Sequence, residues 1–243
     1  MVEIPLARLA LILLPILVVG LIARRWTGRR DEYAYATLRM LGQLLGIGYV
    51  LVLLFRIENP WMATGVVLFM IAMSSWIGVR TVKKLRWSAF CDAVFAIGLG
   101  GGVVLVLVLF GVLGADPWYK PRVLIPLAGM TFSNAMTAVT LAAERFEAEK
   151  VVGKPIEESR NLAWNAALIP QINGFLAVGL VSLPGMMTGQ ILAGASPLDA
   201  VRYQIMVMGL VLGAAGLAVA IFLTRMVGKE VGPSGENSSQ IGA

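Results

Sequence analysis

Residues 180–204 read LVSLPGMMTGQILAGASPLDAVRYQ, a stretch that is apolar enough for a membrane but is interrupted twice by helix-breaking residues. The Pro-Gly pair at 184–185 is expected to end one helix. The SPLD sequence at 196–199 is expected to begin another, with its serine as N-cap and its proline at the first helical position. The residues between these breaks, 186–193, are too few to span a bilayer, which requires about 20. We therefore expect a broken or re-entrant segment between two membrane spans.

The composition of the whole chain also indicates a membrane protein. Of its 243 residues, 58% are hydrophobic and 14% are charged, and the mean hydropathy is +0.81. Soluble domains are typically about 45–50% apolar and about 25% charged. The single cysteine and the lack of histidine exclude a disulfide within the chain and a Cys/His zinc site. The net charge of +6 comes from basic residues beside apolar runs, which indicates membrane topology and argues against a nucleic-acid partner.

Seven apolar segments are long enough to cross a bilayer. They are residues 4–23, 37–55, 61–79, 91–114, 121–143, 164–183 and 198–224. The predicted fold is therefore an all-α integral membrane protein with about seven transmembrane helices. Residues 1–227 form its transmembrane domain. Residues 228–243 are polar and rich in Gly and Ser, which predicts a disordered tail.

The distribution of basic residues predicts the orientation of these helices. With the N-terminus outside, 15 of the 20 Lys and Arg residues lie on the inner side. The positive-inside rule then favours an N-out, C-in protein that crosses the membrane an odd number of times. This orientation puts the loop of about residues 144–164 on the inner face and the broken segment of about residues 184–197 on the outer face.

Polar side chains inside the apolar segments are candidates for a translocation path. Asn134 and Thr137 share one face of a predicted helix, and a polar face toward lipid would be costly, so it should meet protein or a wet cavity. Such groups serve either in hydrogen bonds between helices or in lining a path, and methionines serve either as packing or as contacts for a soft metal ion. The candidates are Asn134, Thr137, Gln171, Asn173, Met186, Met187, Thr188 and Gln190.

The inner loop is predicted to form a helix–turn–helix. Gly153 suits the position just after a helix, Pro155 suits the first position of the next, and Glu157 and Glu158 are favourable in its first turn. The element is either a solvated turn or a docking site for a cytoplasmic partner. The docking candidates are Glu149, Gly153, Pro155, Glu157 and Glu158.

Three pairs of glycines recur at a spacing of four residues, which puts both members on one helix face. They are Gly42 and Gly46, Gly98 and Gly102, and Gly209 and Gly213. Such faces let helices approach closely in lipid. We expect them to mark close packing within the subunit, with a dimer interface as the alternative.

Two stretches carry a family resemblance. Residues 179–205, GLVSLPGMMTGQILAGASPLDAVRYQI, look like the FetB/YbbM-type ABC transporter permeases. Residues 125–146, IPLAGMTFSNAMTAVTLAAERF, are similar to the middle segment of the same family, and the resemblance extends from about residue 30 onward.

The resemblance implies a homodimeric permease of the inner cell membrane that pairs with a cytoplasmic ABC ATPase subunit. Bacterial relatives are associated with iron export and plant relatives with aluminium tolerance. It also implies that residues 147–165 dock on the ATPase and that the broken segment is an outer gate. The gate candidates are Pro184, Gly185, Gly189, Gly194 and Pro197.

The residues themselves argue against an enzyme. The sequence has no G-x-x-x-x-G-K-[ST] phosphate loop, so ATP is expected to bind the partner subunit and no cofactor is expected in this chain. The lack of histidine leaves no nucleophile–base arrangement of the usual kind. The alternatives to an ABC permease are a seven-helix scaffold or receptor and a transporter driven by an ion gradient without an ATPase.

Overall fold

The computed structural model describes residues 5–27, 30–80 and 86–231, and they fall into two compact units, residues 1–57 and 58–243. Every regular element in these described ranges is helical, apart from one isolated β-bridge between Val178 and Ser182. The predicted all-α fold is therefore confirmed. Residues 228–231 continue the last helix and residues 232–243 lie outside the described ranges, so the predicted tail stays a prediction.

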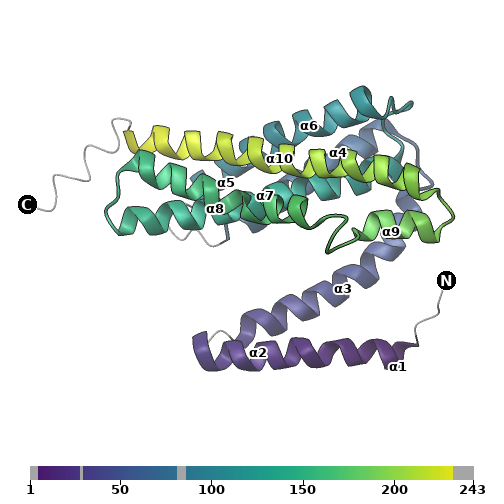
Figure 1. Cartoon of the computed structure of the whole chain (residues 1–243), viewed down its shortest axis with the longest axis horizontal. Helices are drawn as coiled ribbons and strands as arrows, with labels where there is room; N and C mark the ends of the chain where they lie inside the picture. Colours follow the sequence, from purple (N-terminus) through teal and green to yellow (C-terminus); the bar gives the residue numbers. More distant parts are fainter. Residues whose placement is uncertain (1–4, 28–29, 81–85, 232–243) are drawn as a thin grey trace, which may run out of the picture. The chain divides into compact units, whose positions relative to one another are not determined.

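The first unit is a helical hairpin, drawn in purple in Figure 1. Its elements are α1 (Leu6–Leu9), the 3-10 turn η1 (Ala10–Ile12), α2 (Leu13–Thr27) and α3 (Arg30–Leu54). In α2 only Ala23 is buried, and none of residues 32–54 of α3 is buried. The hairpin therefore presents almost all of its apolar surface outward, as lipid-facing helices do.

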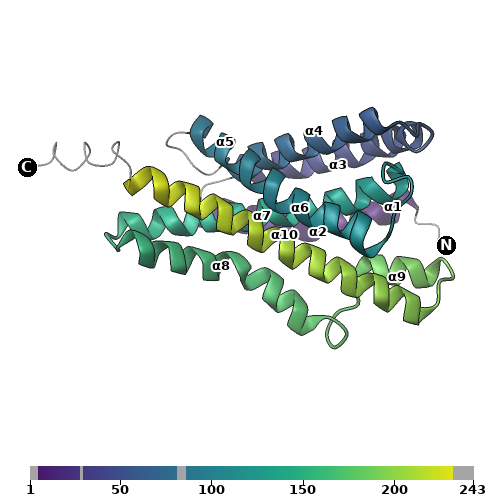
Figure 2. The same ribbon diagram turned by 90° about the horizontal axis from the view of Figure 1, so that it is seen from above.

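The second unit is a helix bundle. Its elements are α4 (Pro60–Gly78), α5 (Arg86–Ala96), η2 (Ile97–Gly101), α6 (Gly102–Val106), η3 (Leu107–Val112), α7 (Pro121–Val151), α8 (Ile156–Ala177), α9 (Gly185–Leu192) and α10 (Pro197–Val231). The long helices α7 and α10 pack on each other and on α8, and they supply most of the buried core, including Phe132, Phe146 and Phe222 (Figure 2). Residues 86–112 form one continuous helical run in which η2 and η3 are π-helical.

Among the glycines of the described part of the bundle, Gly100 lies closest to the backbone of a neighbouring helix. A Cβ atom added there would lie 2.6 Å from the backbone nitrogen of Ala218, so only glycine lets η2 approach α10 at this point. The predicted glycine pairs do not mark comparable contacts. A Cβ atom at Gly102 or Gly209 would meet nothing within 4 Å, and one at Gly98 or Gly213 would make only ordinary contacts of 3.5 and 3.4 Å.

The same is true in the first unit, where a Cβ atom at Gly42 or Gly46 would meet nothing within 4 Å. Gly98 and Gly213 thus contact side chains of neighbouring helices, whereas the other four glycines show no such contact, so the expected close packing is seen only in part. The spacing reports that two glycines share a face, but it does not report whether a neighbouring backbone lies against that face. The alternative, a dimer interface, stays a prediction.

Six helical runs are long and apolar enough to cross a membrane. They are Ala10–Thr27, Glu32–Leu54, Pro60–Gly78, Trp87–Val112, Pro121–Val151 and Pro197–Lys229. They correspond to six of the seven predicted spans, and the seventh, residues 164–183, lies mostly in α8, which is outside this set. The number of crossings and their orientation therefore stay predictions.

The predicted end of the 164–183 span is wrong by six residues. Helix α8 ends at Ala177, whose carbonyl oxygen accepts hydrogen bonds from the amides of residues 180, 181 and 182 at 3.2, 2.9 and 3.1 Å. Gly179 follows with φ +80°, a left-handed conformation that suits glycine. The chain thus leaves the helix at Gly179, well before the Pro184-Gly185 pair that was expected to end it.

Candidate functional site

The segment between α8 and α10 is broken as the sequence predicts. After the loop 178–184, α9 contributes only eight residues, and it packs along the first turns of α10 (Figures 1 and 2). A Schellman motif ends α9. Gly194, at φ +96°, donates its N–H to the carbonyl oxygen of Ile191, and Ala195 donates to that of Gln190, both at 3.0 Å. Helix α10 then begins at Pro197, which confirms the predicted short segment and the helix start after it.

Four of the five outer-gate candidates lie in this short helix or at its ends, and the fifth begins α10. Pro184 is the N-cap of α9, Gly185 is its first residue and Gly189 is exposed in its centre. Gly194 supplies the left-handed turn, and Pro197 is the first residue of α10. The structure brings these residues into one local element, and their role as a gate stays a prediction.

The polar residues of α7 bond to their own helix. The side-chain nitrogen of half-buried Asn134 donates to the carbonyl oxygen of Met130 at 2.8 Å, and the hydroxyl of exposed Thr137 donates to that of Ser133 at 3.0 Å. Hydrogen bonding between helices is instead made by Thr140, whose hydroxyl donates to Gly78 on α4 at 2.9 Å. Among the described residues, the side chains of Asn134 and Thr137 therefore form hydrogen bonds within α7 and not to another helix.

Two glutamines in the bundle are buried with an unpartnered side-chain oxygen. Gln171 on α8 and Gln204 on α10 are each 6% exposed, and the Oε1 atom of neither has a hydrogen-bond partner. An unsatisfied buried polar group costs roughly 1–3 kcal/mol, so these oxygens need a ligand, a water molecule or a partner group. Gln171 was among the predicted path residues, whereas Gln204, which directly follows Arg202 and Tyr203, was not.

The remaining path candidates fall into two groups. Asn134 and Thr137 lie on α7, and Gln171 and the exposed Asn173 lie on α8. The two helices pack on each other, so these four residues lie on neighbouring helices. The others lie on α9, which packs on α10. There Thr188 is exposed and donates to the carbonyl oxygen of Pro184 at 3.2 Å, while the side chains of Met186, Met187 and Gln190 are half-buried.

The predicted helix–turn–helix is formed by the end of α7 and the start of α8. Gly153, at φ +85°, donates to the carbonyl oxygen of Lys150 at 2.9 Å, and Lys154 donates to that of Glu149 at 3.2 Å, a second Schellman motif. Pro155 is the N-cap of α8 and not its first helical residue, a shift of one position from the prediction. The turn between α7 and α8 is therefore fixed by backbone hydrogen bonds.

An ion-pair network holds this turn. The Lys154 ammonium lies 3.3 Å from Glu149 Oε2 on α7 and 3.0 Å from Glu158 Oε1 on α8, and Arg145 also pairs with Glu149. Hydrogen bonds to Glu158 and then to Glu149 raise the pKa of Lys154 above its ordinary value. Sequence reasoning missed Lys154, although its spacing of four residues from Glu158 is a recognisable helix pair.

The five docking candidates differ in exposure. Glu149 is buried and its carboxylate is used inside the turn, whereas Gly153, Pro155, Glu157 and Glu158 are exposed. Two apolar residues that sequence reasoning did not select lie beside them. Val151 and Val152 are 87% and 76% exposed, which is unusual for valines at the end of a helix that packs in the core. The α7–α8 turn therefore presents an apolar tip next to exposed carboxylates.

A pocket of about 370 Å³ opens between α8 and α10. Its polar lining is Arg160, Asn161 and Thr224, and Trp164 adds an indole ring. The side-chain oxygen of Asn161 accepts hydrogen bonds from Nε and Nη2 of Arg160 at 3.3 and 3.2 Å. The pocket thus combines one oriented guanidinium with an aromatic wall.

A buried carboxylate ties α5 to the far end of α10. Asp92 accepts a hydrogen bond from Nε of Arg225 at 2.8 Å and another from Lys229, whose ammonium also donates to Ser88 at 2.7 Å. The guanidinium of Arg225 lies 4.7 Å from the centre of the Phe95 ring. Breaking such a buried pair leaves an uncompensated charge, so the cluster fixes how these two helices meet.

In residues 5–27, 30–80 and 86–231 no group of three or more His, Cys, Asp or Glu side chains is arranged to hold a metal ion. The atoms of the broken segment that could bind a metal ion include backbone and amide oxygens and the thioether sulfurs of Met186 and Met187.

The chain was compared with known proteins. The model of a family described as Uncharacterised protein family (UPF0014) matches residues 6–230. The chain is 34% identical to the Probable iron export permease protein FetB of Escherichia coli K12, over 89% of each chain. It is 33% identical to UPF0014 membrane protein slr1647 of Synechocystis, over 77% of this chain and 79% of that protein.

A plant relative is also similar. Protein ALUMINUM SENSITIVE 3 of Arabidopsis thaliana is 30% identical, over 76% of this chain and 71% of its own length. No solved structure matches the chain. The apolar helices and these relatives agree on a multi-pass membrane protein, and the resemblance to FetB-type permeases is confirmed. The chain therefore belongs to the UPF0014 family of membrane proteins, which includes a relative named as a permease.

Proposed function

We propose that the chain is the membrane-spanning permease subunit of an ABC transporter that exports a metal ion such as iron. It works as a homodimer in the inner cell membrane and is driven by a cytoplasmic ATPase subunit. ATP binding and hydrolysis reside in that partner, and this chain carries no cofactor. The name of the Escherichia coli relative supports both the permease role and iron as the substrate.

The observation that carries the proposal is the α7–α8 turn. A docking element must transmit movement from a partner to the membrane helices, so it has to be rigid and exposed. The Schellman motif at Gly153 and the Lys154 ion pairs provide the rigidity. The exposed side chains of Val151 and Val152 provide apolar surface for a partner to bury. Both helices of the turn run directly into the bundle that contains the path candidates.

The proposed path uses the broken helix and the unpartnered glutamine oxygens. Interrupted helices occur at the substrate sites of many transporters, because freed backbone carbonyl groups and helix ends can replace the hydration shell of an ion. Buried oxygens of Gln171 and Gln204 would serve a passing cation as weak, neutral ligands. A weak site suits transport, since the ion has to leave it again.

Purification together with the separate ABC ATPase subunit that is proposed to pair with this permease tests the assignment. We expect the full chain in lipid nanodiscs to retain the ATPase and to stimulate its ATP hydrolysis. Proteoliposomes with the complex should accumulate Fe²⁺ only when ATP is supplied on the ATPase side. A scaffold or receptor would neither stimulate hydrolysis nor move the metal. A gradient-driven transporter would move the metal without ATPase, so each alternative gives a different result.

The buried glutamines provide a prediction that separates transport from folding. Replacing Gln171 or Gln204 by Met removes an unpartnered buried oxygen while keeping a similar volume, so the free energy of unfolding should stay equal or rise by ~1 kcal/mol. If the oxygens bind the ion, metal flux should fall roughly tenfold, since a bond to a charged group contributes ~1.5 kcal/mol. Thermal unfolding and flux are measured on the same preparation. Glutamines with a purely structural role would leave flux unchanged.

A further inference from the structure

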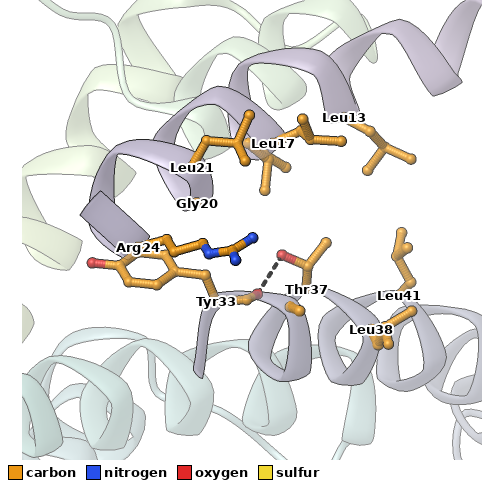
Figure 3. Close-up of a pocket in the computed structure, with 11 residues that line it drawn as sticks. Leu13, Leu17, Gly20, Leu21, Arg24, Tyr33, Thr37, Leu38 and Leu41 are labelled. Carbon is orange, nitrogen blue, oxygen red and sulfur yellow. Dashed lines mark hydrogen bonds between the residues drawn. The ribbon is translucent and has the colours of Figure 1, made fainter. Parts of the chain in front are cut away.

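A groove of about 510 Å³ lies between α2 and α3 of the first unit (Figure 3). Apolar side chains line one end of it, among them Leu13 and Leu17 on α2 and Leu38 and Leu41 on α3. Arg24 lies at the other end, close to the turn between the two helices. The groove is therefore amphipathic along its length, with a cation at one end and a hydrocarbon surface toward the other.

The guanidinium of Arg24 is placed to receive an anion. In Figure 3 it points into the groove, on the side of Thr37. The hydroxyl hydrogen of Thr37 is already donated to the carbonyl oxygen of Tyr33 at 2.8 Å, and Arg24 supplies the positively charged donors at this end. Within the described part of the chain, no acidic side chain pairs with Arg24. An Arg side chain offers a planar fork that matches phosphate oxygens.

The length of the groove matches one leaflet of a bilayer. Leu13 and Arg24 are eleven residues apart on α2, which corresponds to about 16 Å along a helix axis. The hydrocarbon core of a bilayer is about 30 Å thick, so the groove extends from near the bilayer centre to the headgroup level. Leu17 and Leu38, which flank it, are 60% and 70% exposed, as expected of side chains that meet acyl chains.

We infer that this groove binds an anionic phospholipid, with one acyl chain along the leucines and the headgroup phosphate on Arg24. The end of the hairpin that carries Arg24 and Arg25 favours the leaflet with negative surface charge. The binding site lies entirely in the first unit. None of its residues belongs to the α7–α8 turn or to the path candidates, and the inference does not depend on the proposed transport function.

The inference is tested by native mass spectrometry of the purified full chain titrated with dioleoyl phosphatidylglycerol. Arg24→Gln should lower the affinity for this lipid roughly fivefold, the factor that corresponds to about 1 kcal/mol for one basic residue at an anionic surface. Arg25→Gln is the matched control, because Arg25 is the adjacent and exposed arginine but does not line the groove. Arg24→Lys keeps the charge and should retain most of the affinity.

A second variant tests the apolar part of the groove without changing any charge. Gly20 lines the groove, and Gly20→Leu should fill it and lower lipid binding to the level of Arg24→Gln. Gly46→Leu is its control, since a Cβ atom there meets nothing within 4 Å and Gly46 does not line the groove. Size-exclusion profiles of all variants establish that each is folded.

Several results would overturn the inference. Equal losses for Arg24→Gln and Arg25→Gln would show only a general effect of surface charge. Equal binding of phosphatidylcholine would remove the role of the anionic headgroup, and equal binding of glycerol phosphate would remove the role of the acyl chain. A further outcome is that the protein retains no lipid, while residues of the groove form cross-links to protein. That result would show that a protein segment or a second copy covers the groove.

Discussion

Gly100→Ala is expected to destabilise the protein by about 1–3 kcal/mol or more, the range for overpacking a tight core contact. The added Cβ atom would lie 2.6 Å from the nitrogen and 2.9 Å from the Cα atom of Ala218. Both atoms belong to the backbone of α10, so no side-chain rotation can relieve the clash. The helices must separate, which disturbs the packing between η2 and α10. Thermal unfolding in detergent should show a lowered midpoint and a reduced yield of monodisperse protein.

Gly102→Ala is the matched control for this prediction. The two glycines are two residues apart on the same apolar run, yet a Cβ atom at Gly102 meets nothing within 4 Å. Because alanine favours the helix over glycine by about 1 kcal/mol, this variant should be neutral or slightly stabilising. Equal stability of the two variants would mean that η2 and α10 do not approach each other as described.

The contrast between these two glycines explains which parts of the fold can be predicted from sequence. Local sequence signals predicted the short α9 and the helix ends and starts at Gly153, Gly194 and Pro197. These features depend on backbone preferences within a few residues. The importance of Gly100 depends on Ala218, which is far away in the chain, and no local pattern reports that approach. Spacing alone therefore did not identify Gly100.

The same distinction applies to the candidate site. Glu149 was selected as a docking candidate, but its side chain is buried and its carboxylate pairs with Arg145 and Lys154. The pairing of Asp92 with Arg225 joins residues 133 positions apart, so the sequence offered no sign of it. The early end of α8 at Ala177 was missed because the Pro184-Gly185 pair was taken as the stop signal and Gly179 was not.

The exposed tip of the α7–α8 turn leads to the largest expected functional effect. Replacing both valines, Val151→Ser and Val152→Ser, should lower the affinity for the ATPase subunit roughly hundredfold, since burial of a valine side chain contributes ~1.5 kcal/mol or more. The double variant should fold normally, because both side chains already face solvent and the Schellman motif uses only backbone groups. Binding to the ATPase and stimulation of ATP hydrolysis in nanodiscs are the measurements.

Leu192→Ser is the matched control, because Leu192 is 82% exposed in α9 and lies away from the α7–α8 turn, at the other end of the bundle (Figure 1). It removes a comparable apolar surface and should leave ATPase binding unchanged. If the valine variant binds the ATPase as well as the unaltered chain does, the tip is not the docking surface. If both variants lose binding equally, the effect comes from general loss of apolar surface.

The proposed coupling requires that the valine variant alone loses ATPase binding and that metal flux falls with it. Only that result supports a turn that couples ATP hydrolysis to movement of α7 and α8. Because Lys154 holds both helices at this turn, a force applied at the tip reaches α7 and α8 together.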